Sequence, residues 1–164
     1  MRTLRELFHH QIQDLHSGET QIIEALPDLI EDARDQELKD ALSHHLEETR
    51  EQQRTLETIA EQLEIDAEGE TCKGMKGILT EGDELVEDEA EDDVVDAAIV
   101  TACQRVEHYE MAAYGSARTY ARMLGHDDIA GTLEEILDQE KKADATLTRI
   151  AEDHVNRAAA TATV

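Results

Sequence analysis

The sequence predicts an all-α fold in which four long helices form a bundle. Apolar residues recur at helical spacing in four segments, at residues 3–33, 35–64, 92–124 and 127–155. A single Pro and eight Gly occur among the 164 residues. A β-sandwich needs turn residues about every eight to twelve positions, so this composition argues against one. No run of about 18 apolar residues is present, which argues against a membrane-spanning helix.

The first two segments each carry one apolar stripe. In segment 3–33 the stripe includes Phe8, Ile12, Leu15, Ile22 and Leu26. Pro27 lies inside this segment, and because its ring blocks a helical hydrogen bond we expect a kink or an early end there. In segment 35–64 the stripe includes Leu38, Leu42, Leu46, Leu56 and Ile59. Both patterns predict helices with one buried face.

The last two segments are predicted to form a hairpin of helices. Segment 92–124 carries Val95, Ile99, Val106, Ala113 and Ala117, and segment 127–155 carries Ile129, Leu133, Ile136, Leu147 and Ile150. Gly125 is suited to end the first of these helices, and Asp127 is suited to cap the start of the second. We therefore expect a tight turn between them.

Residues 65–92 form a long connection that is rich in Gly and acidic residues. Met75, Ile78 and Leu79 within it predict a short helix packed on the outside of the bundle. A short, a long and a short connection in that order are typical of ferritin-like bundles rather than of simple up-down bundles. We expect one bundle domain over residues 1–155 and a flexible C-terminal tail over residues 156–164.

Net charge narrows the functional classes. The chain has 40 Asp and Glu against 15 Lys and Arg, a formal charge of -25. Nucleic acids and anionic lipids are bound by clustered basic residues, so neither is an expected partner. Such charge is screened at about 1 M salt, where the Debye length is roughly 3 Å. We therefore predict a salt-rich cytoplasm such as that of halophilic archaea.

The cysteines and the N-terminus also bear on the compartment. Cys72 and Cys103 form neither a CxxC pair nor a zinc-ligand cluster, so we expect two free thiols in a reducing compartment. The first residues lack a continuous apolar stretch and a small-residue cleavage site, which argues against a signal peptide. The cytoplasm is the expected location.

Acidic and amide side chains interrupt all four apolar stripes near their centres. They are Glu19 in the first segment, Glu48 and Gln52 in the second, Glu107 and Glu110 in the third, and Glu140 and Asp144 in the fourth. Burying a carboxylate costs several kcal/mol unless a cation compensates it. The inward positions contain no Lys or Arg. A pair of metal ions compensates such a cluster, because hard cations prefer oxygen ligands and carboxylates bridge two of them.

The spacing of these residues indicates two related half-sites. Glu48 follows Glu19 by 29 residues, and Glu140 follows Glu110 by 30. Glu48 with Gln52, and Glu140 with Asp144, are both i, i+4 pairs. This pattern is typical of a di-metal carboxylate site in a bundle. A network of carboxyl groups that share protons, or a single structural ion, is the alternative interpretation.

Four further side chains are candidates to support the ligands: His16, His45, Tyr109 and Tyr114. A histidine or tyrosine beside a ligand commonly orients it through a hydrogen bond. Ordinary packing is the alternative for each of them. The acidic run Glu84–Asp93 is expected to be a solvated face and a helix N-terminus, with surface calcium binding as its alternative.

Several stretches resemble a known family, namely LFHHQIQDLHSGETQIIEALP, HLEETREQ, RVEHYEMAAYGSAR and LDQEKKAD. They are similar to the YciE/YciF family of ferritin-like proteins, also called domain of unknown function 892, over about residues 4–151. The resemblance implies a ferritin-like bundle with a crossover helix, a di-metal centre, an association with stress and a homodimer. By position, the ligands would be Glu19, Glu48, Gln52, Glu107, Glu110, Glu140 and Asp144.

The ligand set departs from that of ferritins and rubrerythrins, which usually place a His three residues after the second-helix and fourth-helix Glu. Here those positions are Glu51 and Ala143. The expected cofactors are two metal ions, iron with manganese as the alternative. The expected function is oxidation of Fe(II) or consumption of O2 or H2O2 in stress, with no catalytic residue separate from the ligands. The alternative is a non-catalytic stress protein with a structural metal or none.

Overall fold

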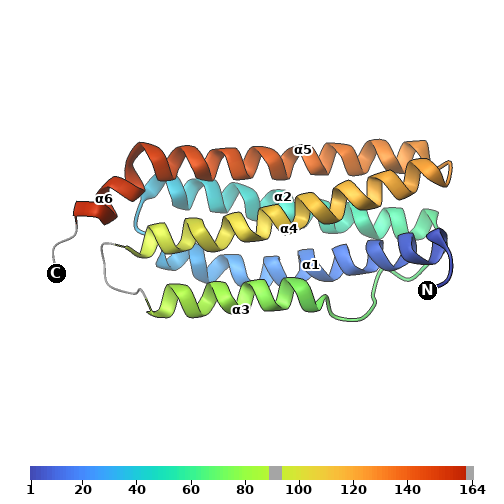
Figure 1. Cartoon of the computed structure of the whole chain (residues 1–164), viewed down its shortest axis with the longest axis horizontal. Coiled ribbons are helices and arrows are strands. Elements are labelled where there is room, and N and C mark those ends of the chain that lie inside the picture. Colours follow the sequence, from blue (N-terminus) through green and yellow to red (C-terminus); the bar gives the residue numbers. More distant parts are fainter. Residues whose placement is uncertain (89–93, 162–164) are drawn as a thin grey trace.

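The computed structural model describes residues 1–88 and 94–161, apart from the side chain of Asp88. Within these residues the chain is helical without strands, which confirms the predicted fold class. The elements are α1 (Leu4–Asp32), α2 (Gln36–Gln62), α3 (Lys73–Asp88), α4 (Val95–Met123) and α5 (Asp127–Ile150), followed by a short π-helical turn, η1 (Ala151–Val155), and α6 (Asn156–Thr161) (Figure 1).

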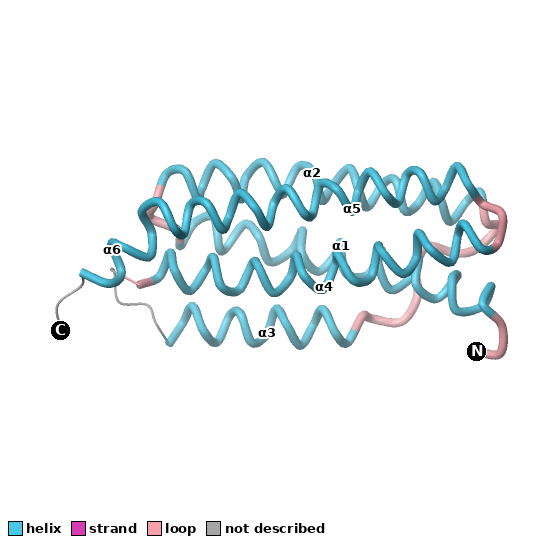
Figure 2. Tube along the Cα trace, turned by 45° about the horizontal axis from the view of Figure 1, so that its top comes forward, coloured by secondary structure: helices cyan, strands magenta, loops and turns pink. Residues whose placement is uncertain are grey.

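Helices α1, α2, α4 and α5 form the bundle, and α3 lies along its outside against α4 and α1 (Figures 1 and 2). The chain leaves α2 at the end of the bundle where the N-terminus lies. Helix α3 carries it back towards the other end, so that α4 runs in the same direction as α2. The predicted crossover with a short external helix is therefore confirmed.

Local sequence explains where the helices begin and end. The side chains of Thr3 and Asp35 accept hydrogen bonds from backbone N–H groups in the first turns of α1 and α2. Gly125 has φ +81°, and its N–H and that of His126 donate to the last carbonyls of α4. The capping role predicted for Asp127 is wrong: His126 precedes the helix and Asp127 is its first residue.

Pro27 does not end α1 early, because the helix continues to Asp32. Pro27 is exposed, and its missing N–H removes one bond from a helix that is held by packing on both sides of it. Within the acidic run Glu84–Asp93, Glu84 and Glu87 are exposed in the last turns of α3 and not at a helix N-terminus. Residues 89–93 lie outside the described residues.

The expected tail begins with α6, a short helix with no buried residue. Its flexibility stays a prediction. No helix of the part described, 1–88 with 94–161, combines the length and the hydropathy that crossing a membrane requires.

The apolar core consists of two clusters, one towards each end of the bundle. One contains Ile22, Leu42, Ile99, Leu147 and Ile150 with the residues that α3 covers. The other contains Phe8, Leu56, Tyr114, Leu133 and Leu137. On each bundle helix at least one buried polar residue lies between the two clusters. The fold therefore places a polar layer across the middle of its own core.

Candidate metal centre

The polar layer is formed by seven buried side chains, to which each bundle helix contributes at least one. They are Glu19 from α1, His45, Thr49 and Gln52 from α2, Glu107 and Glu110 from α4, and Glu140 from α5. Each has at most 7% of its surface exposed. Four ionisable carboxyl groups in such a place need compensation by protons or by a cation.

Four of these residues form the centre of the layer. His45, Glu107, Glu110 and Glu140 each offer one ligand atom, and these atoms all lie within 4.8 Å of one another. Glu107 and Glu110 are three residues apart on α4 and therefore share a face of that helix. Three helices thus direct three carboxylates and one imidazole to a common point.

Glu19 and Gln52 extend the centre. The Tyr114 hydroxyl donates a hydrogen bond to Glu19 Oε1, and Glu19 is also hydrogen-bonded to Glu110. The Gln52 side-chain amide donates to Glu140 Oε1 and, at 3.1 Å, to Gln139 Oε1. These contacts fix the orientation of two carboxylates while each keeps its second oxygen available.

In all four buried carboxyl groups, one oxygen has no hydrogen-bond partner among the described residues. They are the Oε2 atoms of Glu19, Glu107, Glu110 and Glu140, joined by Oε1 of Gln52 and Nε2 of His45. A buried polar atom without a partner costs about 1–3 kcal/mol. Native proteins contain few such atoms, and six of the nine found in the part of the chain that the structure describes belong to this one layer. Five oxygen atoms and one imidazole nitrogen are a donor set that fits hard or borderline cations.

Burial shifts the pKa of every carboxyl group in this layer upward. Desolvation first, and repulsion from Glu140 second, raise the pKa of Glu19 to about 8. Desolvation raises the pKa of Glu140 to about 7, and it raises the pKa values of Glu107 and Glu110 well above their usual range. Without metal, the layer therefore retains protons at neutral pH, and a bound cation would displace them.

His45 is neutral in this setting. Burial, with a smaller contribution from His44, lowers the pKa of His45 to about 4. Its Nε2 atom lies 3.2 Å from Glu107 Oε1. An uncharged imidazole cannot neutralise the carboxylates, but it is the form of histidine that binds metal.

Two predicted ligands lie at the rim of the layer. The side chains of Glu48 and Asp144 are 22% and 21% exposed. Glu48 Oε1 lies 3.4 Å from His44 Nε2, and its charge contributes to raising the pKa of Glu140. Asp144 Oδ1 accepts from Gln104 at 3.0 Å, and its charge contributes to raising the pKa of Glu107. Both stand next to the buried carboxylates, one step closer to solvent.

Of the four supporting side chains, His45 lies in the layer, and Tyr114 reaches it from the neighbouring apolar cluster by donating to Glu19. The structure places the other two elsewhere. His16 Nε2 lies 3.6 Å from Glu57 Oε1 on α2. The Tyr109 hydroxyl lies 3.2 Å from Cys72 Sγ and donates to Asp14 at 3.4 Å. Tyr109 therefore supports the junction between α3 and the bundle and not the carboxylates.

The ligands predicted from the sequence include His45 only in a supporting role and do not include Thr49. The signal was present: Leu38, Leu42, His45, Thr49, Gln52 and Leu56 follow one another at alternating intervals of four and three residues. That interval defines the inward face of a bundle helix. Thr49 is fully buried and donates to the His45 carbonyl at 2.8 Å. Glu48 lies one position off this line, which explains its partial exposure.

Comparison with known proteins gives a consistent picture. A family model described as a domain of unknown function (DUF892) matches residues 3–160. Protein YciF of Escherichia coli strain K12 is 36% identical over 160 residues, which are 97% of this chain and 96% of that protein.

Two solved structures have the same fold. The crystal structure of the Escherichia coli stress protein YciF matches with a TM-score of 0.90 at 35% identity, over 96% of this chain and 99% of that one. YcfI from Rhodopseudomonas palustris, proposed to be a structural protein, matches with a TM-score of 0.87 at 39% identity, over 90% and 94% of the two chains.

Proposed function

Because the chain belongs to the DUF892 family, whose reaction its description leaves open, we propose that the polar layer is a ferritin-like di-metal centre acting in stress response. The observation that carries this proposal is the convergence of unpartnered buried oxygens from all four bundle helices. Within residues 1–88 and 94–161, no Lys or Arg lies among the buried polar residues of the core, so no Lys or Arg there neutralises these oxygens.

We assign His45, Glu107, Glu110 and Glu140 as the central ligands. Glu19 and Gln52 complete the buried set, and Glu48 and Asp144 close it towards solvent. Two ferrous ions held there would supply the two electrons that reduce one dioxygen, together with two protons, to hydrogen peroxide. The expected activity is oxidation of Fe(II) or consumption of O2 or peroxide.

The residues around the ligands have separate tasks in this proposal. Tyr114 holds the Glu19 carboxyl by donating its hydroxyl proton, and Gln52 holds Glu140 in the same manner. Both leave the second carboxylate oxygen directed to the centre. The two apolar clusters shield the layer from water along the bundle axis, which strengthens the electrostatic interactions in the layer. The oxygen-rich donor set keeps manganese as the alternative metal.

A second candidate function is a non-catalytic structural role. Hydrogen bonds already link Tyr114 to Glu19, Glu19 to Glu110, and Gln52 to Glu140, so protons alone could stabilise the layer. The Rhodopseudomonas palustris relative proposed to be structural favours this reading.

Anaerobic titration with Fe(II), followed by exposure to air, separates the two candidates. We expect about two ions per chain by elemental analysis, the number that a di-metal centre holds. We also expect near-ultraviolet absorption with oxygen uptake on oxidation. Glu140→Ala removes a central ligand and should abolish both the iron binding and the oxidation signals. Glu135→Ala changes an exposed residue of the same helix and should leave both intact. Binding of iron without oxygen uptake would favour the structural role, and absence of binding would refute the metal centre.

The setting of this function is proposed as well. Two buried free cysteines favour a reducing compartment, and we propose the cytoplasm. A homodimer is the proposed assembly, because the family resemblance implies one; sedimentation analysis of the full chain tests it.

A further inference from the structure

Two pockets reach the same pair of side chains from different sides of the bundle. Both are lined by His45 and Glu107. The first pocket opens between α1, α3 and α4, and the second lies between α2 and α5 beside α4. The polar layer is therefore approached along two routes, and these routes differ in chemistry.

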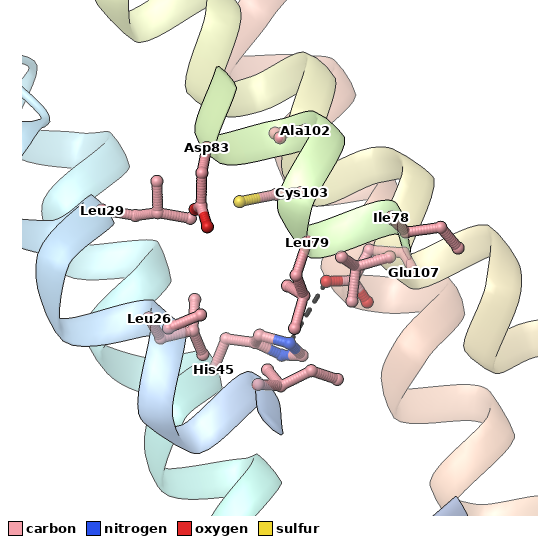
Figure 3. Close-up of a pocket in the computed structure, with 13 residues that line it drawn as sticks. Leu26, Leu29, His45, Ile78, Leu79, Asp83, Ala102, Cys103 and Glu107 are labelled. Carbon is pink, nitrogen blue, oxygen red and sulfur yellow. Dashed lines mark ion pairs between the residues drawn. The ribbon is translucent and has the colours of Figure 1, made fainter. Parts of the chain in front are cut away.

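The first pocket has an almost entirely aliphatic wall. It is lined by Ile22, Leu26, Leu29, Ile78, Leu79 and Val106, together with small residues. Figure 3 shows the paired His45 and Glu107 at one end, and Leu29, Cys103 and Asp83 at the other. Burial and Glu107 raise the pKa of the Cys103 thiol to about 12, so this side chain stays uncharged. Asp83 is a further ionisable group on the wall.

Small residues keep this pocket open where α3 crosses the bundle. Ala25, Gly82 and Ala102 contribute to its wall. A Cβ atom at Gly82 would lie 3.1 Å from the Cβ atom of Ala102, a tight contact, so the absence of a side chain at position 82 favours the close approach of α3 to α4. The free volume is about 20 Å³, roughly that of one water-sized molecule. An organic substrate does not fit.

The second pocket has polar groups at its entrance. His44, Glu48 and Lys142 line it, and the exposed His44 ring lies beside the Glu48 carboxylate. A hydrated cation loses less solvation along such a wall than along an aliphatic one. This side suits the passage of ions and water.

We propose that the first pocket is the entry route of dioxygen to the polar layer, separate from the polar route beside α2 and α5. The proposal rests on the metal centre proposed above and specifies its oxidant. Dioxygen is small, neutral and apolar, and it forms no strong hydrogen bonds that an aliphatic wall would break. Hydrogen peroxide would have to give up its hydrogen bonds with water, and a cation would also lose its hydration.

Dissolved dioxygen is paramagnetic and accelerates the relaxation of nearby nuclei, which allows a test without metal. In chelator-treated protein under oxygen pressure, the methyl groups of Leu26, Ile78 and Leu79 should relax faster than those of Leu56, Leu63 and Ile65, which belong to the other core cluster and match them in burial. Ala25→Leu fills the pocket and should remove this difference. Ala97→Leu is the matched control, because Ala97 is also half-buried on a helix but does not line the pocket.

The same variants are then loaded with Fe(II) and mixed with dioxygen. Ala25→Leu should bind iron normally but oxidise it roughly tenfold more slowly than Ala97→Leu, a barrier increase of about 1.4 kcal/mol. Equal relaxation of the pocket methyl groups and those of the other core cluster would overturn the proposed route while leaving the metal centre intact. Equal oxidation rates in the two variants would do the same. Failure of both variants and the native chain to bind iron would refute the centre and the route together.

Discussion

Glu110 occupies a position that opposes its own ionisation. Its carboxyl group is 2% exposed and is repelled by Glu19, Glu140 and Glu107. At neutral pH this carboxyl group is ionised in the unfolded chain but must take up a proton to be buried without metal, and Gln removes that cost while keeping a similar size. We expect Glu110→Gln to stabilise the metal-free protein by about 1–3 kcal/mol in urea unfolding at neutral pH. We also expect it to abolish metal-dependent stabilisation.

Glu135→Gln provides the control for this experiment, since Glu135 is exposed on α5. It should change stability by less than about 0.5 kcal/mol, as most surface substitutions do. A loss of stability in metal-free Glu110→Gln would count against a site built for cations. It would support a proton-sharing network that contributes to folding on its own.

The raised pKa values predict an unusual pH dependence for chelator-treated protein. The pKa values of Glu19 and Glu140 are raised to about 8 and about 7, against about 4.3 for an unfolded Glu. Between these values the folded state binds more protons than the unfolded state, so stability falls as the pH rises from about 5 to about 8. Urea unfolding at fixed ionic strength across that range measures the slope.

Two comparisons separate this effect from general charge repulsion. Glu19→Gln should reduce the slope, because one of the two shifted groups is gone. Saturating Mn(II) should flatten or reverse it, because metal binding competes with protons and is stronger at high pH. A slope that neither change affects would place its origin outside the polar layer.

The buried acids were predictable from sequence because a carboxylate on an apolar stripe is costly and therefore conspicuous. Glu19, Glu110 and Glu140 interrupt their stripes in line with the neighbouring apolar residues, and all three are buried. Glu48 was placed at the centre because of its charge, although the interval of three and four residues runs through His45. The position of a residue on the helix face determines whether it is buried, and the type of its side chain alone does not.

At the scale of elements, apolar periodicity located every long helix within a few residues. The early end of the helix predicted at Pro27 is wrong, because the cost of one lost hydrogen bond is small against the packing of the whole of α1. Helix α3 was predictable as an amphipathic segment, but its packing position on the bundle was not. That position depends on Gly82 facing Ala102 on α4, a contact between positions 20 residues apart that no local pattern encodes.

The end of α2 offers a direct test of local backbone strain. Glu64 has φ +56°, and its N–H and that of Ile65 donate to the last carbonyls of α2, at Glu61 and Ala60. This left-handed position normally belongs to Gly. We expect Glu64→Gly to raise the free energy of unfolding by about 1 kcal/mol, the cost of that conformation for other residues. Urea unfolding measures it.

Glu61→Gly is the matched control for that substitution. Glu61 is exposed in the last turn of the same helix, where Gly should destabilise by up to about 1 kcal/mol. Equal effects of the two substitutions would show that loss of the charge matters and not the backbone conformation.

At the scale of the whole molecule, the polar layer and the surface have the same requirement: their acidic groups must be screened or neutralised. Both concentrate acidic groups, and the chain carries a formal charge of -25. On the surface, Asp28 on α1 and Asp83 and Glu87 on α3 face one another across the seam between these helices. Repulsion by Glu87 and Asp28 adds to burial in raising the pKa of Asp83. At this seam, apolar contacts hold α3 against α1 and charge opposes them, whereas on the α4 side Glu81 of α3 pairs with Arg105 at 3.2 Å.

Salt should therefore stabilise the protein, and part of the effect should come from this seam. We expect the Tm to rise steadily from low to molar KCl, because the Debye length falls from about 10 Å at 0.1 M to about 3 Å at 1 M. Asp28→Asn should raise the Tm in low salt and make little difference in molar KCl. A Tm that falls with KCl, or an Asp28→Asn gain that persists in molar KCl, would contradict a screening mechanism. Such a result would leave the acidic surface without the role in salt adaptation that the composition predicts.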